Sequence, residues 1–222
     1  MFDGDIPYFI NEAFHADLVA SAELDQLLAG GWRHFGTHFF RYNLGIYGGE
    51  IRRVMPLRIR LADFRLSKSQ RRVLRRNAGL DVSIGPFDVA PETHDLFERH
   101  KRRFKSGVPD SIFDFIVRDA ESSPTELFEI TVRDGGKLVA ASFFDLAERS
   151  VSAIYGCFDP DETARSLGIF TMLKVIEYAT QLGFEFYYHG YAYEGTSFYD
   201  YKKRFNAVEQ FDWQGNWKII TE

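Results

Sequence analysis

A basic segment at residues 65–77, RLSKSQRRVLRRN, contains the side chains whose types and spacing most clearly suit a chemical task. It holds six lysine and arginine residues and no acidic residue, although the 222-residue chain carries a formal net charge of −5. At about 100° per residue, a helix places five of these cations on one face; they are Lys68, Arg71, Arg72, Arg75 and Arg76. A solvated surface helix usually mixes both charge signs, so this face predicts a polyanionic partner.

The start of that helix is marked by Ser67 and Gln70. Their spacing of three residues is the pattern of a capping box, which satisfies backbone N–H groups in a first helical turn. A second basic cluster follows at residues 99–105, but Glu92, Asp95 and Glu98 accompany it. Because runs of mixed charge are typical of solvated helix faces, we expect this second cluster to be ordinary surface.

Arg165 and Gly168 form an R-x-x-G segment between a predicted strand and a long predicted helix. Backbone N–H groups at a helix start, together with the positive end of the helix dipole, can bind an anion. A metal site is not expected. His34 and His38 have metal-ligand spacing, but a zinc site needs at least three protein ligands, and Cys157 is the only cysteine.

The elements that must position these residues follow from periodicity. The first part of the chain predicts a helix at 18–29, a strand at 38–47 before a Gly48-Gly49 turn, and a strand with one buried face from Pro56. The basic helix then crosses to a strand at 80–86, and helices are expected at 91–104 and 111–120, with Asp110 and Ser111 as N-caps.

The second half of the chain has a different pattern. Three strands at 126–134, 137–146 and 151–160 are joined by short turns, which predicts an antiparallel meander. A long helix at 164–183 leads to a strand at 184–191, and this crossover implies one parallel pair. A closing strand or hairpin is expected around Gln214–Asn216. The prediction is a mixed α/β sheet flanked by helices, with a small subdomain at 1–60 and the main domain at 61–222.

The composition of the chain limits the class of protein and its location. The hydrophobic fraction of 45% is ordinary for a globular protein, and aromatic residues reach 16%. The chain opens with MFDGDIPYF, which lacks the basic start of a signal peptide, and no apolar run approaches 18 residues. We therefore expect a cytoplasmic protein without a membrane partner. The sequence does not fix an oligomeric state.

Three strands, an R-x-x-G loop, a helix and a strand occur in the order found in acyltransferases of the GNAT fold, and the chain resembles them here. The resemblance implies a GNAT-like, mostly antiparallel sheet. It also raises the alternative of an acetyl-CoA-dependent N-acetyltransferase. Phe170 stands where those enzymes have Gly or Ala, so we expect it to hinder the approach of coenzyme A to the loop.

Six separated segments, read together, resemble the aminoacyl-tRNA–protein transferases that move leucine or arginine from charged tRNA to a protein N-terminus. They are GWRHFG with FFRY, PLRI, SKSQRRVLRRN, YGCFDPDETARSLGIF, HGYAY, and YKKRF with Glu209. The family's cysteine-rich region before PLRI has no counterpart here, where Arg53, Val54 and Met55 stand. The resemblance therefore implies the transferase core and leaves the acceptor open.

This resemblance implies roles for particular residues. The tRNA acceptor end would be held at its phosphates by Arg71, Arg72, Arg75, Arg76, Arg165 and Gly168, and its terminal adenine would stack on Tyr155, Phe158 or Tyr191. Proton handling would fall to Asp159 or to Tyr201 beside Lys202, and His189 lies at a strand end nearby. The alternatives are a cap for Asp159 and sheet core for the aromatic and histidine side chains.

The donor in this interpretation is aminoacyl-tRNA as co-substrate, without a further cofactor, and the partners are the tRNA acceptor end and a protein or peptide N-terminus. An aminoacyl ester is already activated, and an α-amine with a pKa of about 7.7–8.0 is partly nucleophilic at neutral pH. The enzyme therefore needs mainly positioning, oxyanion stabilisation and removal of one proton. A non-catalytic RNA-binding relative remains a third alternative.

Overall fold

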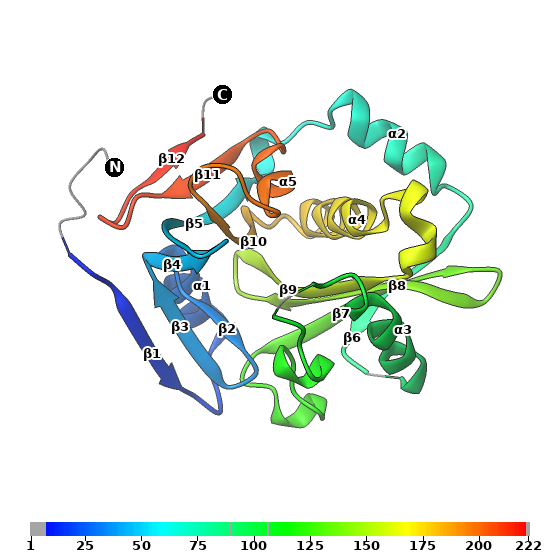
Figure 1. The fold of residues 1–222 in the computed structure, drawn as a ribbon, viewed down its shortest axis with the longest axis horizontal. Helices are drawn as coiled ribbons and strands as arrows, with labels where there is room; N and C mark the ends of the chain where they lie inside the picture. Colours follow the sequence, from blue (N-terminus) through cyan, green and yellow to red (C-terminus); the bar gives the residue numbers. More distant parts are fainter. Residues whose placement is uncertain (1–7, 89, 106, 221–222) are drawn as a thin grey trace.

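A nine-stranded mixed sheet forms the centre of the computed structural model, which describes residues 8–88, 90–105 and 107–220 (Figure 1). The strands run in the order β12-β11-β5-β10-β9-β8-β7-β6, and β4 pairs with β5 outside this path. Their bounds are β4 Leu44–Tyr47, β5 Glu50–Arg60, β6 Asp81–Pro86, β7 Glu126–Asp134, β8 Lys137–Leu146, β9 Ser150–Phe158, β10 Phe186–Tyr193, β11 Val208–Phe211 and β12 Trp217–Ile219. Residues 1–7, where a signal peptide was not expected, lie outside the described residues.

The predicted sheet topology is confirmed. Strands β7, β8 and β9 form an antiparallel meander, and β10 pairs in parallel with β9. The other partner of β10 is β5, in antiparallel orientation, so the sheet is mixed but mostly antiparallel. The closing hairpin of β11 and β12 also forms as expected.

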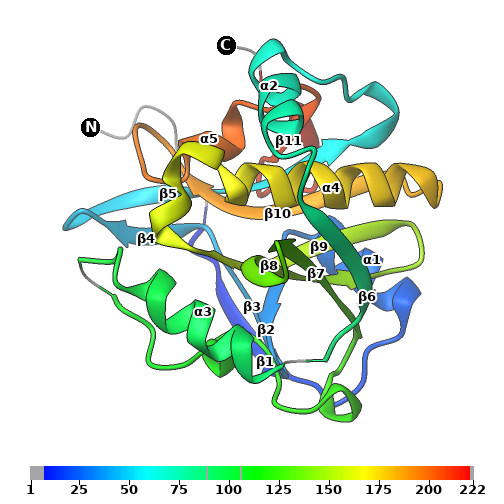
Figure 2. The same ribbon diagram turned by 90° about the vertical axis from the view of Figure 1, so that its right-hand side faces the viewer.

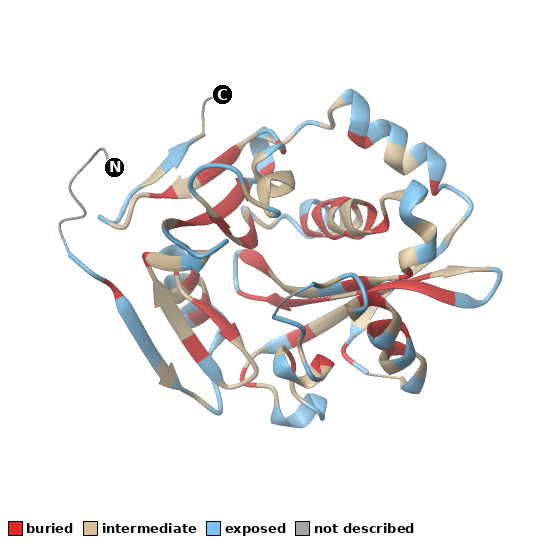
Figure 3. Ribbon diagram, in the orientation of Figure 1, coloured by how far each residue is buried: buried red, intermediate tan, exposed pale blue. Residues whose placement is uncertain are grey.

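Helices cover the main sheet on both faces (Figure 2). On one face, α4 (Leu167–Gln181) packs on β8 and β9 and carries α2 (Lys68–Arg76) on its outer side, while α3 (Pro91–Lys101) packs on the opposite face. The core under α4 includes Ile59, Phe144 and Phe170, and the core under α3 includes Phe97 and Phe143. Figure 3 shows the resulting pattern, with buried strands between helices whose outer faces are exposed.

A separate three-stranded sheet precedes the main one. It consists of β1 (Asn11–His15), β3 (His38–Tyr42) and β2 (Arg33–Phe35), and α1 (Ser21–Ala29) packs beside it. The division of the chain at residue 60 stays a prediction. The main sheet itself includes β5, which precedes that boundary and pairs with β10 and β11.

Three local predictions were wrong. The single strand predicted at 38–47 is two strands, β3 in the small sheet and β4 in the main sheet, because the chain passes from one sheet to the other at Asn43. The segment 111–120 does not form an amphipathic helix: Ile112–Asp114 makes one short 3₁₀ turn, although Ser111 caps it as expected. Strand β5 has no exposed face at residues 54–59, because it lies inside the sheet and is covered on both sides. Arg58 is tolerated there because its guanidinium lies 2.7 Å from the Glu209 carboxylate and over the Phe186 and Trp217 rings.

A short element at Asp200–Lys203, labelled α5, follows β10. The helices of the described residues include none long and apolar enough to cross a membrane.

A buried ion pair joins the small sheet to the main sheet. The Nε2 atom of His34, on β2, lies 2.8 Å from Asp145 Oδ2 on β8. Its Nδ1 atom lies 2.8 Å from the Gly36 carbonyl oxygen. Both ring nitrogens face acceptors, so both donate and the ring is cationic. Burial acts to lower the pKa of His34, but the Asp145 carboxylate outweighs it and the pKa is raised. His34 therefore has structural partners at both nitrogens, and the exposed His38 stacks on His15.

The His34–Asp145 pair predicts a pH dependence of stability. Because the folded pKa lies above the unfolded value of about 6.5, the stabilisation is complete below that value and is lost as pH rises through the folded pKa. We expect the free energy of unfolding in urea to fall with rising pH, and His34→Gln to remove this part of the fall. The control is His38→Gln at an exposed position. An unaltered pH dependence in His34→Gln would show that His34 is not charged.

Candidate active site

The strands β9 and β10 separate after only three residue pairs, and the separation defines the candidate site. Their parallel pairing covers Phe186 with Ser150, Tyr187 with Val151 and Tyr188 with Ser152. Beyond this point β9 stays with β8, while β10 has an irregularity between Tyr188 and Gly190 and follows β5. Backbone groups beyond the separation therefore need partners other than a neighbouring strand.

Arg33 supplies one of these partners. Its guanidinium donates from Nη1 to Ser152 Oγ at 2.9 Å and from Nη2 to the Ala153 carbonyl oxygen, directly after the last paired residue of β9. The side chain comes from β2 of the small sheet, and Arg33 is 8% exposed. The small sheet therefore contributes a buried cation to the point where the main sheet opens.

Lys202 lies on the β10 side of the separation. Its Nζ donates to the Tyr191 carbonyl oxygen at 3.0 Å, and its own carbonyl oxygen accepts from His189 Nε2 at 3.1 Å. A side chain at Gly190, where φ is 91°, would bring a Cβ to 2.9 Å from Lys202 Nζ. The left-handed backbone favours glycine here, and a larger residue would also displace the end of the Lys202 side chain.

The surroundings on this side lower the pKa values of both the lysine and the histidine. Burial, reinforced by the positive charge of Arg33, lowers the pKa of Lys202 to about 7. Burial and the Lys202 charge lower the pKa of His189 to about 3, and its Nδ1 has no hydrogen-bond partner among the described residues. Burial raises the pKa of Tyr201 to about 12. Lys202 is therefore the group of this cluster that can exchange a proton near neutral pH.

Aromatic rings line the β9 side. Tyr155 stacks on Phe115 with ring centroids 4.0 Å apart, and its hydroxyl is buried without a hydrogen-bond partner in the described part of the chain. The Phe158 ring contacts His100 at a centroid distance of 4.6 Å and lies 4.3 Å from the Arg103 guanidinium carbon. Burial lowers the pKa of His100 to about 4. One face of Tyr155 is already used by the protein, and adenine stacking stays a prediction.

Asp159 is buried within an ion-pair network at the end of β9. Its Oδ2 lies 2.9 Å from Lys137 Nζ and 3.6 Å from Arg99 Nη2, and its Oδ1 accepts from the Asp161 N–H at 3.1 Å. Burial acts to raise the pKa of Asp159, but these partners outweigh it and the pKa is lowered. A carboxylate held in this way is a weak base, so its contacts correspond to the alternative role of a cap.

The basic helix and the R-x-x-G loop lie side by side. The capping box of Ser67 and Gln70 forms as expected, and Arg76 donates to the Ala164 carbonyl oxygen. Asn77 donates to the Arg165 carbonyl oxygen at 2.9 Å. The cationic side chains of the helix, Lys68, Arg71, Arg72, Arg75 and Arg76, are all exposed. The predicted cationic face thus continues to the start of α4.

The R-x-x-G loop is less suited to binding an anion than the sequence predicted. The Arg165 guanidinium lies 2.8 Å from Asp134 and 3.0 Å from Glu162, so its charge is already compensated. Gly168 fits under the Phe158 ring, where an added Cβ would be 3.1 Å from it. Phe170 is 3% exposed and packs into the core beneath α4. The expected hindrance of the loop by Phe170 is therefore wrong, because the side chain points into the core.

The structure brings Lys202, Tyr201, His189 and Tyr191 together, and places Tyr155 and Phe158 on the facing strand. The positive charge of Arg103, just after α3, also acts on Tyr155 and Tyr201. Arg33 and Arg103 were missed as site residues. Arg33 lies within GWRHFG, one of the segments of the family resemblance, so a signal for it was present.

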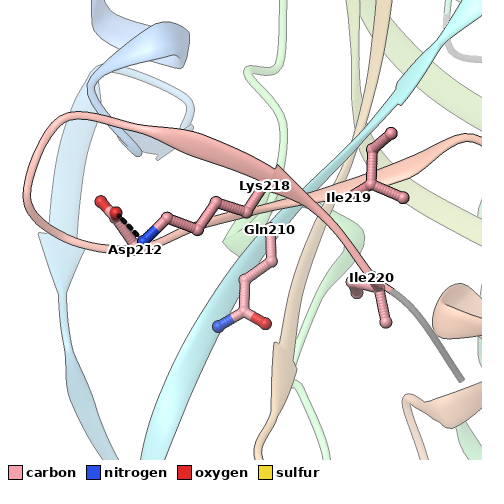
Figure 4. Close-up of a pocket in the computed structure, with 5 residues that line it drawn as sticks. All are labelled: Gln210, Asp212, Lys218, Ile219 and Ile220. Atoms are coloured by element: carbon pink, nitrogen blue, oxygen red, sulfur yellow. Dashed lines mark ion pairs between the residues drawn. The ribbon is translucent and has the colours of Figure 1, made fainter.

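A shallow pocket in the β11–β12 hairpin lies apart from this cluster (Figure 4). It is lined by Gln210, Asp212, Lys218, Ile219 and Ile220, and Asp212 pairs with Lys218 at 2.8 Å. Its two ionised side chains neutralise each other, and it contains none of the predicted site residues.

Known proteins are similar to this chain in sequence or in fold. Residues 92–212 match the family model described as "Arginine-tRNA-protein transferase, C terminus". An aspartate/glutamate leucyltransferase of Acinetobacter baumannii is 30% identical over 96% of this chain and 77% of its own length. An aspartate/glutamate leucyltransferase of Paramagnetospirillum magneticum is 35% identical over 74% of this chain and 68% of its own length. The crystal structure of FemX superposes with a TM-score of 0.52 at 10% identity, covering 88% of this chain and 68% of FemX, which bears on the fold alone.

The GNAT-like fold and these matches define an acyltransferase that moves an aminoacyl group from tRNA to protein. Within that class, the chain belongs to the aminoacyl-tRNA–protein transferase family. The resemblance found in the separated segments is confirmed. The roles of the individual site residues stay predictions.

The exposed face of α2 predicts a salt-dependent interaction with tRNA. Replacing Arg72 and Arg75 with alanine should weaken tRNA binding and reduce the slope of log affinity against log salt by about two, since each phosphate contact contributes about one. Filter binding across a salt series measures both quantities. The matched control is Arg102→Ala with Lys105→Ala, two exposed cations on the opposite face of the sheet. If affinity and slope stay at their wild-type values in the α2 variant, this face does not bind tRNA.

Proposed function

We propose that the protein transfers leucine from charged tRNA to the α-amine of proteins whose N-terminal residue is aspartate or glutamate. The observation that carries this proposal is the 30% identity to the Acinetobacter baumannii aspartate/glutamate leucyltransferase over 96% of the chain. The relative from Paramagnetospirillum magneticum has the same name and supports leucine rather than arginine as the transferred residue. No cofactor beyond the aminoacyl-tRNA is needed, because the ester is already activated.

The reaction requires one bond exchange and one proton transfer. The unprotonated α-amine of the acceptor attacks the ester carbonyl carbon, a C–N bond forms, and the C–O bond to the terminal ribose breaks. The attacking nitrogen must lose a proton, and the ribose oxygen must gain one. Lys202, with a pKa of about 7, is partly neutral near pH 7 and therefore accepts the first proton and returns one to the leaving oxygen.

Positive charge surrounds the position of this exchange. Arg33 and Lys202 lie at the separation of β9 and β10, and the positive charge of Arg103 acts on Tyr155 and Tyr201. Lys202 becomes cationic when it accepts the proton, and a cation in a site shielded from water stabilises the oxyanion that develops on the carbonyl oxygen. The exposed cations of α2 hold tRNA phosphates outside this buried region. The aminoacyl-tRNA is therefore bound at two places, its phosphates at the surface and its aminoacyl end in the buried region.

The acetyl-CoA alternative keeps one supporting observation. The N-terminus of α4 lies within R-x-x-G, and Phe170 does not cover it because its side chain is buried. The compensated charge of Arg165 counts against a pyrophosphate at this loop.

The function is tested by incubating the protein with tRNA charged with labelled leucine or arginine and with peptides that begin with Asp, Glu, Lys or Arg. We expect leucine to be transferred to the peptides beginning with Asp and Glu. Calorimetry with acetyl-CoA tests the alternative in parallel. Tight acetyl-CoA binding without transfer from any charged tRNA would overturn the proposed function.

A prediction about Lys202 follows from its role as a base. Lys202→Met should lower kcat/KM for leucine transfer by about 10²- to 10⁴-fold, and Lys202→Arg should not restore it, since a guanidinium does not give up its proton. In the wild type, the rate should rise with pH through about 7 as Lys202 loses its proton, before the further rise that the acceptor α-amine causes at its pKa of about 7.7–8.0. Both variants should lack the rise at about 7 and keep the one that belongs to the amine. Lys203→Met is the control, because Lys203 pairs with Asp200 instead. Wild-type rates in Lys202→Met would exclude Lys202 as the base.

A further inference from the structure

Two arginines of this protein are equally buried but differ in their partners. Arg33 and Arg58 are each 8% exposed. The Arg58 guanidinium lies 2.7 Å from a buried carboxylate, Glu209, and also donates to Tyr188 Oη at 3.1 Å. Arg33 contacts only two neutral oxygens, those of Ser152 and Ala153, and the described residues place no carboxylate within ion-pair distance of it. A buried cation without an anion is costly, so Arg33 is a candidate for binding one.

The charges around Arg33 do not compensate it. Asp145 is the carboxylate whose field reaches Arg33, but its Oδ2 is bonded to His34 and its Oδ1 accepts from Thr125 Oγ1 at 2.7 Å. Since His34 is itself cationic, that carboxylate is already matched. On the other side of Arg33 lies Lys202, which adds positive charge when it is protonated. The immediate surroundings therefore have an excess of positive charge.

The donors of Arg33 are also incompletely used. A guanidinium offers five N–H donors in a planar fork that suits a carboxylate or phosphate. The bonds to Ser152 and Ala153 use one each, and they fix the orientation of the group. The remaining donors have no acceptor among the described residues, and together with the charge they suit a bidentate ligand.

Gly190 brings Arg33 and Lys202 to one place. The position of a Cβ added to Gly190 would be 2.9 Å from Lys202 Nζ and 3.9 Å from Arg33 Nη2. A charged guanidinium and a partly neutral amine thus flank the same small region. Such a pair matches a molecule that carries an anionic group and an amine only a few bonds apart.

We propose that Arg33 binds the side-chain carboxylate of the acidic residue at the acceptor N-terminus, with the α-amine of that residue directed toward Lys202 Nζ. In aspartate and glutamate, two or three carbon atoms separate the carboxylate carbon from the amine nitrogen, and this matches the closeness of the two side chains. Asparagine and glutamine have similar shapes but leave the buried cation uncompensated. This inference rests on the proposed function, and it assigns acceptor selectivity to a residue of the small sheet.

The alternative anion is a tRNA phosphate. The exposed cations of α2 suit a phosphodiester chain better, because they reach a surface polyanion without burying it. Arg33 is buried between strands, where a terminal carboxylate fits with less rearrangement than a phosphate that continues in both directions.

The experiment compares leucine transfer from leucyl-tRNA to four peptides that differ only in their first residue, Asp, Asn, Glu or Gln. For the wild type we expect kcat/KM to be at least about 100-fold higher for Asp than for Asn, since removing one partner of a buried charge is strongly unfavourable. In Arg33→Met this ratio should fall to near one, mainly through loss with the Asp and Glu peptides. Arg33→Lys keeps the charge and should keep part of the preference, which covers the case that Arg33→Met does not fold.

Arg58→Met is the matched control. It removes an equally buried arginine and should reduce thermal stability, but it should leave the ratio of Asp to Asn transfer at the wild-type value. Loss of the preference in both arginine variants would assign it to general destabilisation and overturn the proposal.

Two further measurements separate the possible failures. Filter binding of tRNA to Arg33→Met and Arg33→Lys should match the wild type. Weaker binding with an unchanged peptide ratio would place Arg33 on the donor instead. Calorimetry of the Asp and Asn peptides with wild type, Arg33→Met and Arg33→Lys tests the carboxylate contact without any transfer. If the wild type transfers nothing, the proposed function fails. In that case, calorimetry still tests the subsite: tighter binding of the Asp peptide than of the Asn peptide, lost in Arg33→Met, would support it. Equal binding of the two peptides to the wild type would refute it.

Discussion

The separation of β9 from β10 is the constraint on which the rest of the structure depends. Parallel pairing that ends after three residue pairs leaves strand backbone without its regular partners inside a protein interior. Two side chains supply partners: Arg33, 120 residues away along the chain, bonds to the Ala153 carbonyl oxygen, and Lys202, from the segment that follows β10, bonds to that of Tyr191. Both are cations, so the need to satisfy backbone oxygens also collects positive charge at one buried place.

Positive charge is used in two physically different ways in this molecule. On α2 it is exposed, and water reduces the energy of each contact, so binding there depends on the number of contacts and on salt. At the separated strands it is withdrawn from water, and burial, followed by the charge of Arg33, lowers the pKa of Lys202. The first arrangement suits a long polyanion, whereas the second suits a small group that must be oriented.

Local signals in the sequence were sufficient for much of the fold. The capping box at Ser67, the meander and the crossover before β10 depend on short-range spacing, and each formed as predicted. The helix predicted at 111–120 does not form, although the apolar residues of this segment have helical spacing. Ile112 and Ile116 pack beneath α3 instead, and Phe115 stacks on Tyr155. The burial of Arg58 and the place of Arg33 depend on partners more than 100 residues away, which no local pattern contains.

The position of β5 has a consequence for synthesis of the protein. This strand ends at Arg60 but pairs with β10 and β11, which end at Tyr193 and Phe211. While the ribosome makes the intervening residues, β5 has apolar residues on both faces and two open edges. Such a strand is a template for aggregation until its partners arrive. The neighbour already made, β4, pairs only with residues 50–53 of β5, so residues 54–60 wait for β10 and β11, and the site forms only when synthesis is nearly complete.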